Sequence, residues 1–187
     1  MLINVDNVKE FLGITVETDD NILLPLCQAA QDIADGAVDY QLEGSTHIEF
    51  QDNDGVDIIQ LRNIPIKAVT SIYDDFDRVY GSDTLIPSTD YTFIEKTGVI
   101  TGVGVNFQRG ANNIKVTYLS GYNGLGASAY FAMPYDLRQA LIYLASAMYL
   151  EGKSGINVFE GQDMTYRPNQ LKKEAYKILE GFRKILI

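Results

Sequence analysis

The chain has 187 residues, of which 46% are apolar, and a formal net charge of −10. This length suits one domain, or one domain with an insertion, that buries roughly 70% of its unfolded surface. The apolar content excludes an intrinsically disordered chain. Cys27 is the single cysteine and His47 the single histidine. An intramolecular disulfide is therefore excluded, as are most metal sites and any Cys–His or Ser–His dyad without His47.

The sequence predicts neither a targeting signal nor a membrane span. Its N-terminus lacks the basic region and long apolar run of a signal peptide. No stretch approaches the roughly 20 apolar residues that cross a bilayer. We therefore expect a protein that is made and used in a cytoplasm, with no membrane partner.

The charges are unevenly distributed along the chain. Residues 1–60 carry 13 acidic residues against Lys9 alone, whereas residues 168–187 carry five basic residues against two acidic ones. The acidic N-terminal part would repel phosphate, which argues against tight nucleic-acid binding there. This polarity favours head-to-tail or layered contact between an acidic end and a basic end.

Residues 1–44 predict two helices. Asp6 is the expected N-cap of the first helix, and Gly13 is its expected left-handed terminator. The second helix follows the capping residues 18–20 and runs to about residue 40. Its expected buried face consists of apolar residues at three- and four-residue steps, namely Ile22, Leu26, Ala29, Ile33 and Ala37. Pro25 either kinks this helix or delays its start to about residue 24.

Residues 45–120 change from the helical period to a period of two. Alternation and turn residues predict a hairpin over residues 45–61, a strand over 68–73, a second hairpin over 91–101 and a half-buried strand over 114–118. Short strands between helical flanks predict a small antiparallel sheet that is inserted into a helical frame.

Residues 121–187 predict a flexible GYNGLG connection and two more helices. The central helix, residues 133–151 with Gly152 as its stop, is apolar most of the way round. Such a helix must be covered on two sides by its own chain or by a neighbouring copy, and we expect other subunits to cover it. A long loop over residues 153–167 leads to an amphipathic terminal helix over 168–187, a combination that suggests a mobile arm.

The predicted fold class is therefore α+β. Two N-terminal helices, the central helix and the C-terminal helix form a helical frame, and the antiparallel β insertion lies within it. The corresponding divisions are residues 1–44, 45–120 and 121–187.

The candidate chemical sites all have simpler explanations. The glycines of GVGVNFQRG and GYNGLGAS lack the spacing and residue types of nucleotide-binding loops, so we interpret them as turn or hinge residues. The aspartates of residues 74–83 lack the ligand order of an EF-hand, which favours a solvated turn over a cation site. His47 falls on the polar side of a strand and has no evident catalytic partner, so we expect a surface or interface histidine. Cys27 fits a small buried hydrophobe.

Tyrosines crowd around the central helix. Such residues suit both an interface core and an ordinary protein core, and the sequence does not decide between them. The tyrosines concerned are Tyr118, Tyr122, Tyr130, Tyr135, Tyr143 and Tyr149.

The terminal helix is the candidate partner-docking element. Its basic residues lie largely off the apolar face, where they form either a solvated face or a surface for an acidic protein or DNA. The candidate docking residues are Lys172, Lys173, Lys177, Phe182, Arg183, Lys184 and Ile185.

Six segments in this order resemble the head-tail connector, or adaptor, family of tailed bacteriophages, in particular its longer members with a β insertion. They lie within residues 8–155 and read VKEFLGI, TDDNILLPLCQAAQDIADGAVDY, LRNIPIKAVTSIYDD, YTFIEKTGVITG, NNIKVTYLSGY and MPYDLRQALIYLASAMYLEGKSG.

The resemblance implies a structural virion assembly protein that has no catalytic residues, metal or cofactor. Such a protein forms a homo-oligomeric ring beneath the portal protein, a dodecamer in the virion, and extends the DNA channel toward the tail. DNA passes through the ring without sequence-specific binding. The terminal helix would face the portal, and the β insertion would face outward or toward the next neck or tail-completion protein. The protein would lie in the virion neck after assembly in the host cytoplasm.

Two other functions remain open from the residues alone. A small ligand-binding or hydrolytic α+β domain would use His47 or the aspartates of residues 74–83. A DNA-binding protein would use the basic C-terminal helix, and its binding would fall steeply as salt rises. The connector function is favoured because it needs no residue type that the chain lacks.

Overall fold

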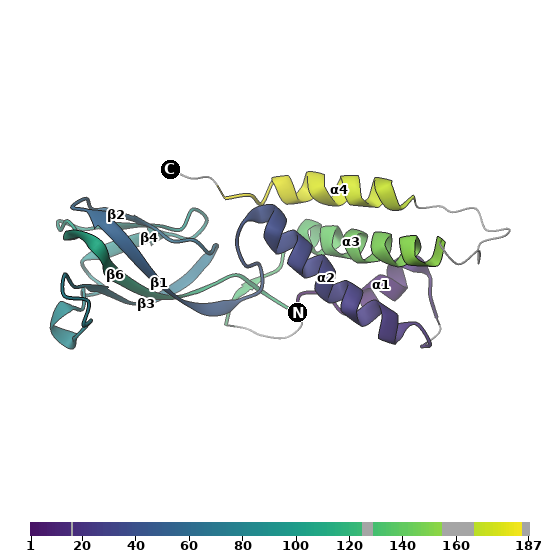
Figure 1. Ribbon diagram of the computed structural model, residues 1–187, viewed down its shortest axis with the longest axis horizontal. Coiled ribbons are helices and arrows are strands. Elements are labelled where there is room, and N and C mark those ends of the chain that lie inside the picture. The colour runs from purple at the N-terminus through teal and green to yellow at the C-terminus, as the bar shows by residue number, and fades with distance from the viewer. Residues whose placement is uncertain (16, 125–128, 155–166, 185–187) are drawn as a thin grey trace. The chain divides into compact units, whose positions relative to one another are not determined.

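The computed structural model describes residues 1–15, 17–124, 129–154 and 167–184, which fall into two units (Figure 1). Met1–Asp39 and Ala132–Arg183 form the helical unit, and the β unit consists mainly of Tyr40–Asn123, together with Lys184. Helices and antiparallel sheets are thus segregated, and the predicted α+β fold is confirmed.

Helix α3 (Tyr135–Ser154) is the centre of the helical unit. Three other helices pack against it, namely α1 (Val5–Leu12), α2 (Asp20–Val38) and α4 (Pro168–Glu180) (Figure 1). Its apolar side chains are buried by this packing, including Leu137, Ala140, Leu141, Leu144, Ala145 and Ala147. The expectation that other subunits cover this helix was therefore wrong, because its own chain supplies the cover.

Helix α3 also continues beyond its predicted stop. It passes through Gly152 to Ser154, although a helical glycine costs about 1 kcal/mol relative to alanine. The Lys153 ammonium lies 3.2 Å from the Asp19 carboxylate and 5.4 Å from the centre of the Tyr149 ring. These contacts stabilise the last turn, so the glycine does not end the helix.

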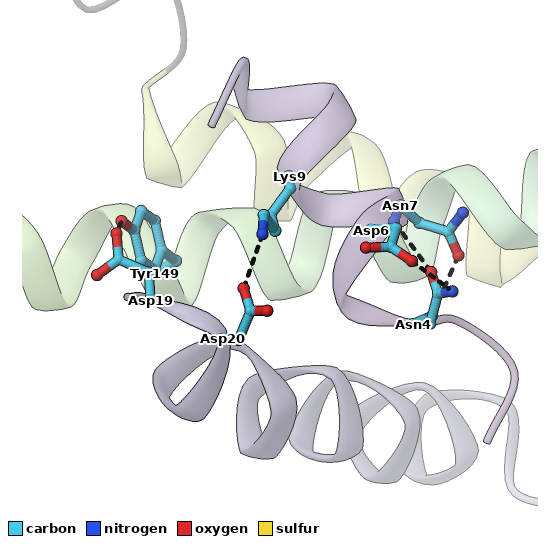
Figure 2. Close-up of polar contacts among 7 residues, drawn as sticks. All are labelled: Asn4, Asp6, Asn7, Lys9, Asp19, Asp20 and Tyr149. Carbon is cyan, nitrogen blue, oxygen red and sulfur yellow. Dashed lines mark hydrogen bonds and ion pairs between the residues drawn. The ribbon is translucent and has the colours of Figure 1, made fainter. Parts of the chain in front are cut away.

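Helix α1 is capped by Asn4, whereas the sequence had suggested Asp6. The Asn4 side chain accepts a hydrogen bond from the Asn7 N–H at 3.0 Å, and the Asn7 side chain accepts one from the Asn4 N–H at 3.1 Å (Figure 2). Asp6 lies in the first turn, where its negative charge favours the helix dipole. At the other end Gly13 adopts a φ of 69°, which confirms the predicted left-handed terminator.

Helix α2 starts at Asp20 and contains Pro25, so the proline does not delay its start. Its buried face differs from the predicted one. Ile22 is 49% exposed and Ile33 is 36% exposed, while the other residues of the predicted face are half-buried. The buried residues are Leu23, Cys27, Ala30, Gln31, Ala34 and Val38. Both stripes have helical spacing, and packing within the helical unit decides which one is covered.

A polar cluster joins α1, α2 and α3 (Figure 2). The Lys9 ammonium lies 2.8 Å from the Asp20 carboxylate, and the Tyr149 hydroxyl donates to Asp19 at 2.5 Å. The hydrogen bond from Tyr149, followed by that from Lys153, holds the pKa of Asp19 below its ordinary value. Burial and the Asp19 carboxylate raise the pKa of Tyr149, so this hydroxyl keeps its proton at neutral pH.

The β unit contains two three-stranded antiparallel sheets and a short strand pair. The larger sheet has the order β1-β6-β3, with β1 (Ser45–Asp54), β6 (Arg109–Ser120) and β3 (Ile66–Asp74). The smaller sheet has the order β2-β5-β4, with β2 (Ile58–Gln60), β5 (Val99–Gly102) and β4 (Tyr91–Ile94). The 3-10 turn η1 (Ser82–Thr84) precedes β4, and β7 (Tyr122–Asn123) pairs with β8 (Phe131–Ala132).

The core of the β unit lies between the two three-stranded sheets. Ile59 and Ile100 of the smaller sheet join one buried cluster with residues of the larger sheet, among them Ile72, Ile114, Val116 and Tyr118. Phe107 completes this cluster from the loop before β6. The alternation predicted for residues 114–118 is confirmed, because Ile114, Val116 and Tyr118 point inward while Lys115 and Thr117 are half-buried on the other face.

The first predicted hairpin does not form, although the second does. Strand β1 pairs with β6 and β2 pairs with β5. The turn within residues 45–61 therefore connects two strands that do not pair with each other. Side chains bridge the gap instead: the Gln51 amide donates to the Gln60 carbonyl at 2.9 Å, and the Asn53 amide donates to the Ile58 carbonyl at 3.1 Å. Strands β4 and β5 pair as predicted, with Gly98 at a φ of 74° in the turn.

Among the described residues, no helix has both the length and the apolar character needed to cross a bilayer.

Replacing Tyr149 with Phe should destabilise the protein in a pH-dependent way. The pKa of Asp19 is depressed in the folded state, so this carboxylate contributes stability above its unfolded pKa of about 3.9 and loses it as the pH falls through the folded value. Urea midpoints should therefore fall for Tyr149→Phe at pH 7, and the difference from the unmodified chain should be smaller at pH 3, below the unfolded pKa of Asp19. Tyr176→Phe, on the exposed side of α4, is the control. Equal destabilisation at both pH values would show that the hydroxyl acts without Asp19.

Candidate functional site

Helix α4 has a buried face and an exposed basic ridge. Leu171, Ala175 and Leu179 are buried, which places Lys173 and Lys177 on the side away from the core. Tyr176 lies between these lysines and is 46% exposed. We call Lys173, Tyr176 and Lys177 the α4 ridge.

Two of the predicted docking lysines already have partners within the chain. The Lys172 ammonium lies 2.7 Å from the Glu151 carboxylate of α3. The Lys184 ammonium donates to the Leu61 carbonyl at 2.7 Å. Neither contact precludes a partner. The Glu151 carboxylate offsets the charge of Lys172, whereas Lys184 keeps its charge and commits one N–H to a neutral carbonyl.

The terminal helix is shorter than predicted. It ends at Glu180, and the N–H groups of Gly181, Phe182 and Arg183 each bond to the carbonyl three residues earlier, as in a tightened last turn. Glycine is a poor helix former, which explains why the helical pattern in the sequence does not continue as helix here. Phe182 is half-buried and Arg183 is exposed. Ile185 lies outside the described residues, as does most of the predicted loop before the helix.

The structure also exposes an apolar surface that the sequence had assigned to the core. Ile22, Leu26, Ala29 and Ile33 recur at four-, three- and four-residue steps along α2, and we call them the α2 stripe. Ile22 and Ile33 are exposed, and Leu26 and Ala29 are half-buried. The only sequence signal for this surface is the presence of two adjacent apolar stripes on one helix. A neighbour that covers one stripe leaves the other exposed.

His47 lies in a polar network on the inward side of β1. Its ring nitrogens lie 2.9 Å from the Ser45 hydroxyl and 3.3 Å from the Asn63 amide. The Tyr118 hydroxyl donates to Glu49 and accepts from the Asn63 N–H at 3.1 Å. Burial lowers the pKa of His47, with Glu49 opposing this effect, so the imidazole is neutral at pH 7.

This network changes the interpretation of strand β1. The expectation of a surface histidine is corrected, because the polar residues of β1 face inward, with His47 half-buried, and Ile48 and Phe50 face outward, 58% and 50% exposed. Strands β1 and β2 form no ladder, so nearby backbone N–H groups need other partners. The network supplies them: the Arg62 N–H donates to Glu49 and the Asn63 N–H donates to Tyr118. The network therefore has a structural explanation.

Asp74 and Asp75, two of the four aspartates in residues 74–83, stabilise loops. Asp77 and Asp83 are exposed, as a solvated turn predicts, but Asp74 and Asp75 are buried, so the prediction was wrong for these two. The Asp75 carboxylate accepts hydrogen bonds from the N–H groups of Asp77, Val79 and Tyr80. Burial alone would raise the pKa of Asp75, but these bonds outweigh burial and lower it. In the part of the chain that the structure describes, no three potential metal ligands gather at one point.

The remaining candidates have structural positions. Cys27 is buried on α2, as predicted, and burial raises the pKa of its thiol to about 11. Gly102 and Gly110 lie in strands β5 and β6 and Gly104 in the connection between them, in agreement with their interpretation as strand and turn residues. Of the GYNGLG connection, residues 125 and 126 lie outside the described part.

The tyrosines that the sequence groups around the central helix are mostly buried or half-buried. Tyr118 and Tyr149 are buried, and the half-buried Tyr143 stacks edge-on against Phe11 with ring centres 5.4 Å apart. Tyr135 is 87% exposed. An ordinary core with aromatic residues therefore accounts for most of this cluster.

Comparison with protein families settles the family. The model of the family described as head completion protein matches residues 1–185. The chain belongs to the head completion protein family. The resemblance to connector proteins of tailed phages is thereby confirmed, and with it the expected role in joining head and tail, at the level of this family. A search of curated proteins returned no match.

Several solved structures share the fold of this head completion protein. A chain in the neck of an empty gene transfer agent (GTA) particle, computed with C6 symmetry, has a TM-score of 0.64 and 18% identity, over 99% of this chain and 91% of that one. A chain in the neck of the native GTA particle, computed with C12 symmetry, has a TM-score of 0.63 and 18% identity, over 98% and 89%. A chain in the virion of the native particle has a TM-score of 0.61 and 19% identity, over 97% and 89%.

Replacing Tyr118 with Phe should destabilise the β unit. The hydroxyl serves both Glu49 and the backbone of Asn63, and its loss removes these hydrogen bonds from a partly buried site, at a cost of about 1 kcal/mol. Urea unfolding at pH 7 measures this cost. The exposed Tyr135→Phe should change stability by less than about 0.5 kcal/mol. An unchanged midpoint for Tyr118→Phe would contradict the structural explanation of the network.

Proposed function

We propose that this head completion protein is a head-tail connector that forms a ring beneath the portal and extends the DNA channel toward the tail. The family match over residues 1–185 carries the proposal. The shared fold with chains in GTA necks supports it. In this role the protein acts through surfaces and needs no catalytic group, metal or cofactor.

The proposed ring is a homo-oligomer that shares the rotational symmetry of the portal, a dodecamer in the virion. One neck structure with a similar chain was computed with C12 symmetry. The α2 stripe and the α4 ridge supply surfaces that a lone molecule leaves uncovered. The ring would be located in the virion neck after assembly in the host cytoplasm.

The charge distribution suits a channel through which DNA slides. Residues 1–60 carry 13 acidic residues against Lys9 alone. Carboxylates repel phosphate, so an acidic channel wall would not retain the DNA. DNA would pass the ring without sequence-specific binding.

The C-terminal region is the proposed docking element for the portal, and the docking set predicted from sequence stays a proposal: Lys172, Lys173, Lys177, Phe182, Arg183, Lys184 and Ile185. Arg183 is its clearest member, because it is exposed and follows the end of α4. The helical frame of residues 1–44 and 121–187 would make the ring. The insertion of residues 45–120 would face outward or toward the next neck or tail-completion protein.

Imaging tests the proposed function directly. Negative-stain images of the protein mixed with its portal rings should show an added ring, coaxial with the portal and of the same rotational order. The same images of the protein alone at rising concentration report whether the portal is needed for assembly. A chain that stays monomeric at high concentration and leaves the portal rings unchanged would contradict the proposal.

Arg183→Glu should weaken docking on the portal. A surface charge pair contributes up to about 1 kcal/mol, so affinity should fall by up to about fivefold per contact, and the loss should shrink as salt rises. Co-sedimentation with portal rings at two salt concentrations measures this. Lys96→Glu, an exposed residue between β4 and β5, is the matched control and should bind normally. Equal losses for both variants would argue against docking through Arg183.

A further inference from the structure

The α2 stripe is a continuous apolar surface. Ile22 and Ile33 lie eleven residues apart, which corresponds to about 16 Å along a helix. Between them Leu26 and Ala29 continue the stripe on the same side. Single exposed apolar residues are common, but a row over three helical turns indicates a contact surface.

The residues beside the stripe give it a charge preference. Helix α2 has three acidic residues, Asp20, Asp32 and Asp35, and no basic residue. Asp32 is exposed and directly precedes Ile33. A partner for this surface should therefore offer apolar area together with positive charge.

The α4 ridge has this complementary character. Lys173 and Lys177 are exposed one helical turn apart, and Tyr176 offers an amphipathic ring next to them. The other lysines of the described helices have partners: Lys9 pairs with Asp20, Lys153 with Asp19 and Lys172 with Glu151. Exposed lysines on these helices are thus concentrated on the ridge.

Both surfaces belong to the helical unit and point away from its centre. Helices α2 and α4 lie beside α3 (Figure 1). They pack through their buried residues, so the exposed residues of the stripe and the ridge remain on the outside. A cyclic ring is built from one head-to-tail contact that uses two different surfaces of each subunit. The stripe and the ridge meet this requirement.

We propose that the α2 stripe of one copy docks on the α4 ridge of the next copy, and that this contact closes the ring. The inference rests on the proposed ring and specifies its subunit interface. Ile22, Leu26 and Ile33 supply the buried apolar area, with Tyr176 of the adjacent copy against them. Asp32 faces Lys173 or Lys177 across the contact. Arg183 and Phe182, beyond the end of α4, then remain for the portal.

Complementary single-surface variants test this pairing. Ile33→Asp disrupts the stripe and keeps the ridge, whereas Tyr176→Asp disrupts the ridge and keeps the stripe. Each variant alone should remain monomeric at concentrations at which the unmodified chain forms rings, with or without portal rings. An equimolar mixture has one intact surface of each kind and should form a dimer of one chain of each variant. Sedimentation velocity measures these masses.

The controls separate loss of contact from loss of fold. Both substituted side chains are partly exposed, so circular dichroism and the unfolding midpoint should be close to those of the unmodified chain. Ile94→Asp, at an isoleucine of β4 that is 56% exposed, should still form rings.

Disulfide trapping gives a second measurement that detects a weak contact. A mixture of Ile33→Cys and Tyr176→Cys should form a covalent heterodimer under mild oxidation, since the two positions meet across the interface. Neither variant should form a covalent homodimer when it is oxidised alone. The native Cys27 is buried, which keeps it from competing.

The outcomes distinguish the interface from the ring itself. Rings from Ile33→Asp or Tyr176→Asp alone, or a mixture that yields neither a dimer nor a trapped heterodimer, would overturn the pairing and leave the connector function intact. Normal rings of Ile33→Asp that fail to dock would assign the stripe to the portal instead. An unmodified chain that never forms a ring, alone or on the portal, would remove the proposed function and the interface with it.

Discussion

The apolar surface of helix α3 is the constraint on which the helical unit depends. Burying a Leu side chain in full stabilises a protein by about 1.5–3 kcal/mol relative to leaving it exposed, and α3 buries Leu137, Leu141 and Leu144 in three successive turns. A helix of this kind needs neighbours on several sides, and α1, α2 and α4 supply them. This arrangement uses one face of α2 and one face of α4 and leaves their other faces on the outside. The surfaces available for assembly therefore follow from the way the core is covered.

In the β unit, two sheets are joined without a hairpin between β1 and β2. The inward side of β1 has His47, Glu49, Gln51 and Asn53. The side chains of Glu49, Gln51 and Asn53 bond to backbone groups of residues 58–62, and His47 contacts the Ser45 hydroxyl. Buried polar groups are stable only when they are paired, so this network fixes the path of residues 55–63. The same inversion places Ile48 and Phe50 on the outer side of the sheet.

These features fit a protein that works through its surfaces. Three of the candidate catalytic or metal-binding groups have structural hydrogen bonds: His47 in the β1 network, and Asp74 and Asp75 with loop backbone. The family match points to head completion, and the fold is shared with chains of GTA necks. The acidic N-terminal part and the basic ridge of α4 give one chain two unlike surfaces, which is the property that a ring of identical subunits requires.

Local sequence determined much of the fold because the signals concerned are local. Gly13 ends a helix and Gly98 makes a turn, because glycine readily adopts positive φ. The amphipathic pattern of α4 predicts its buried face correctly. The order of weak segments was enough to identify the family, and the basic residues of α4 were found from charge alone.

Other features depended on partners far away in the sequence. Only tertiary packing decided which of the two apolar stripes of α2 is buried, because both have the same spacing. Strand β1 pairs with β6, about 70 residues away in the sequence, and not with the nearby β2. Two of the candidate docking lysines turned out to be bonded to Glu151 and the Leu61 carbonyl, which no local pattern reveals. Periodicity reports that a surface is apolar or charged, whereas the neighbour that covers it is set by contacts between distant segments.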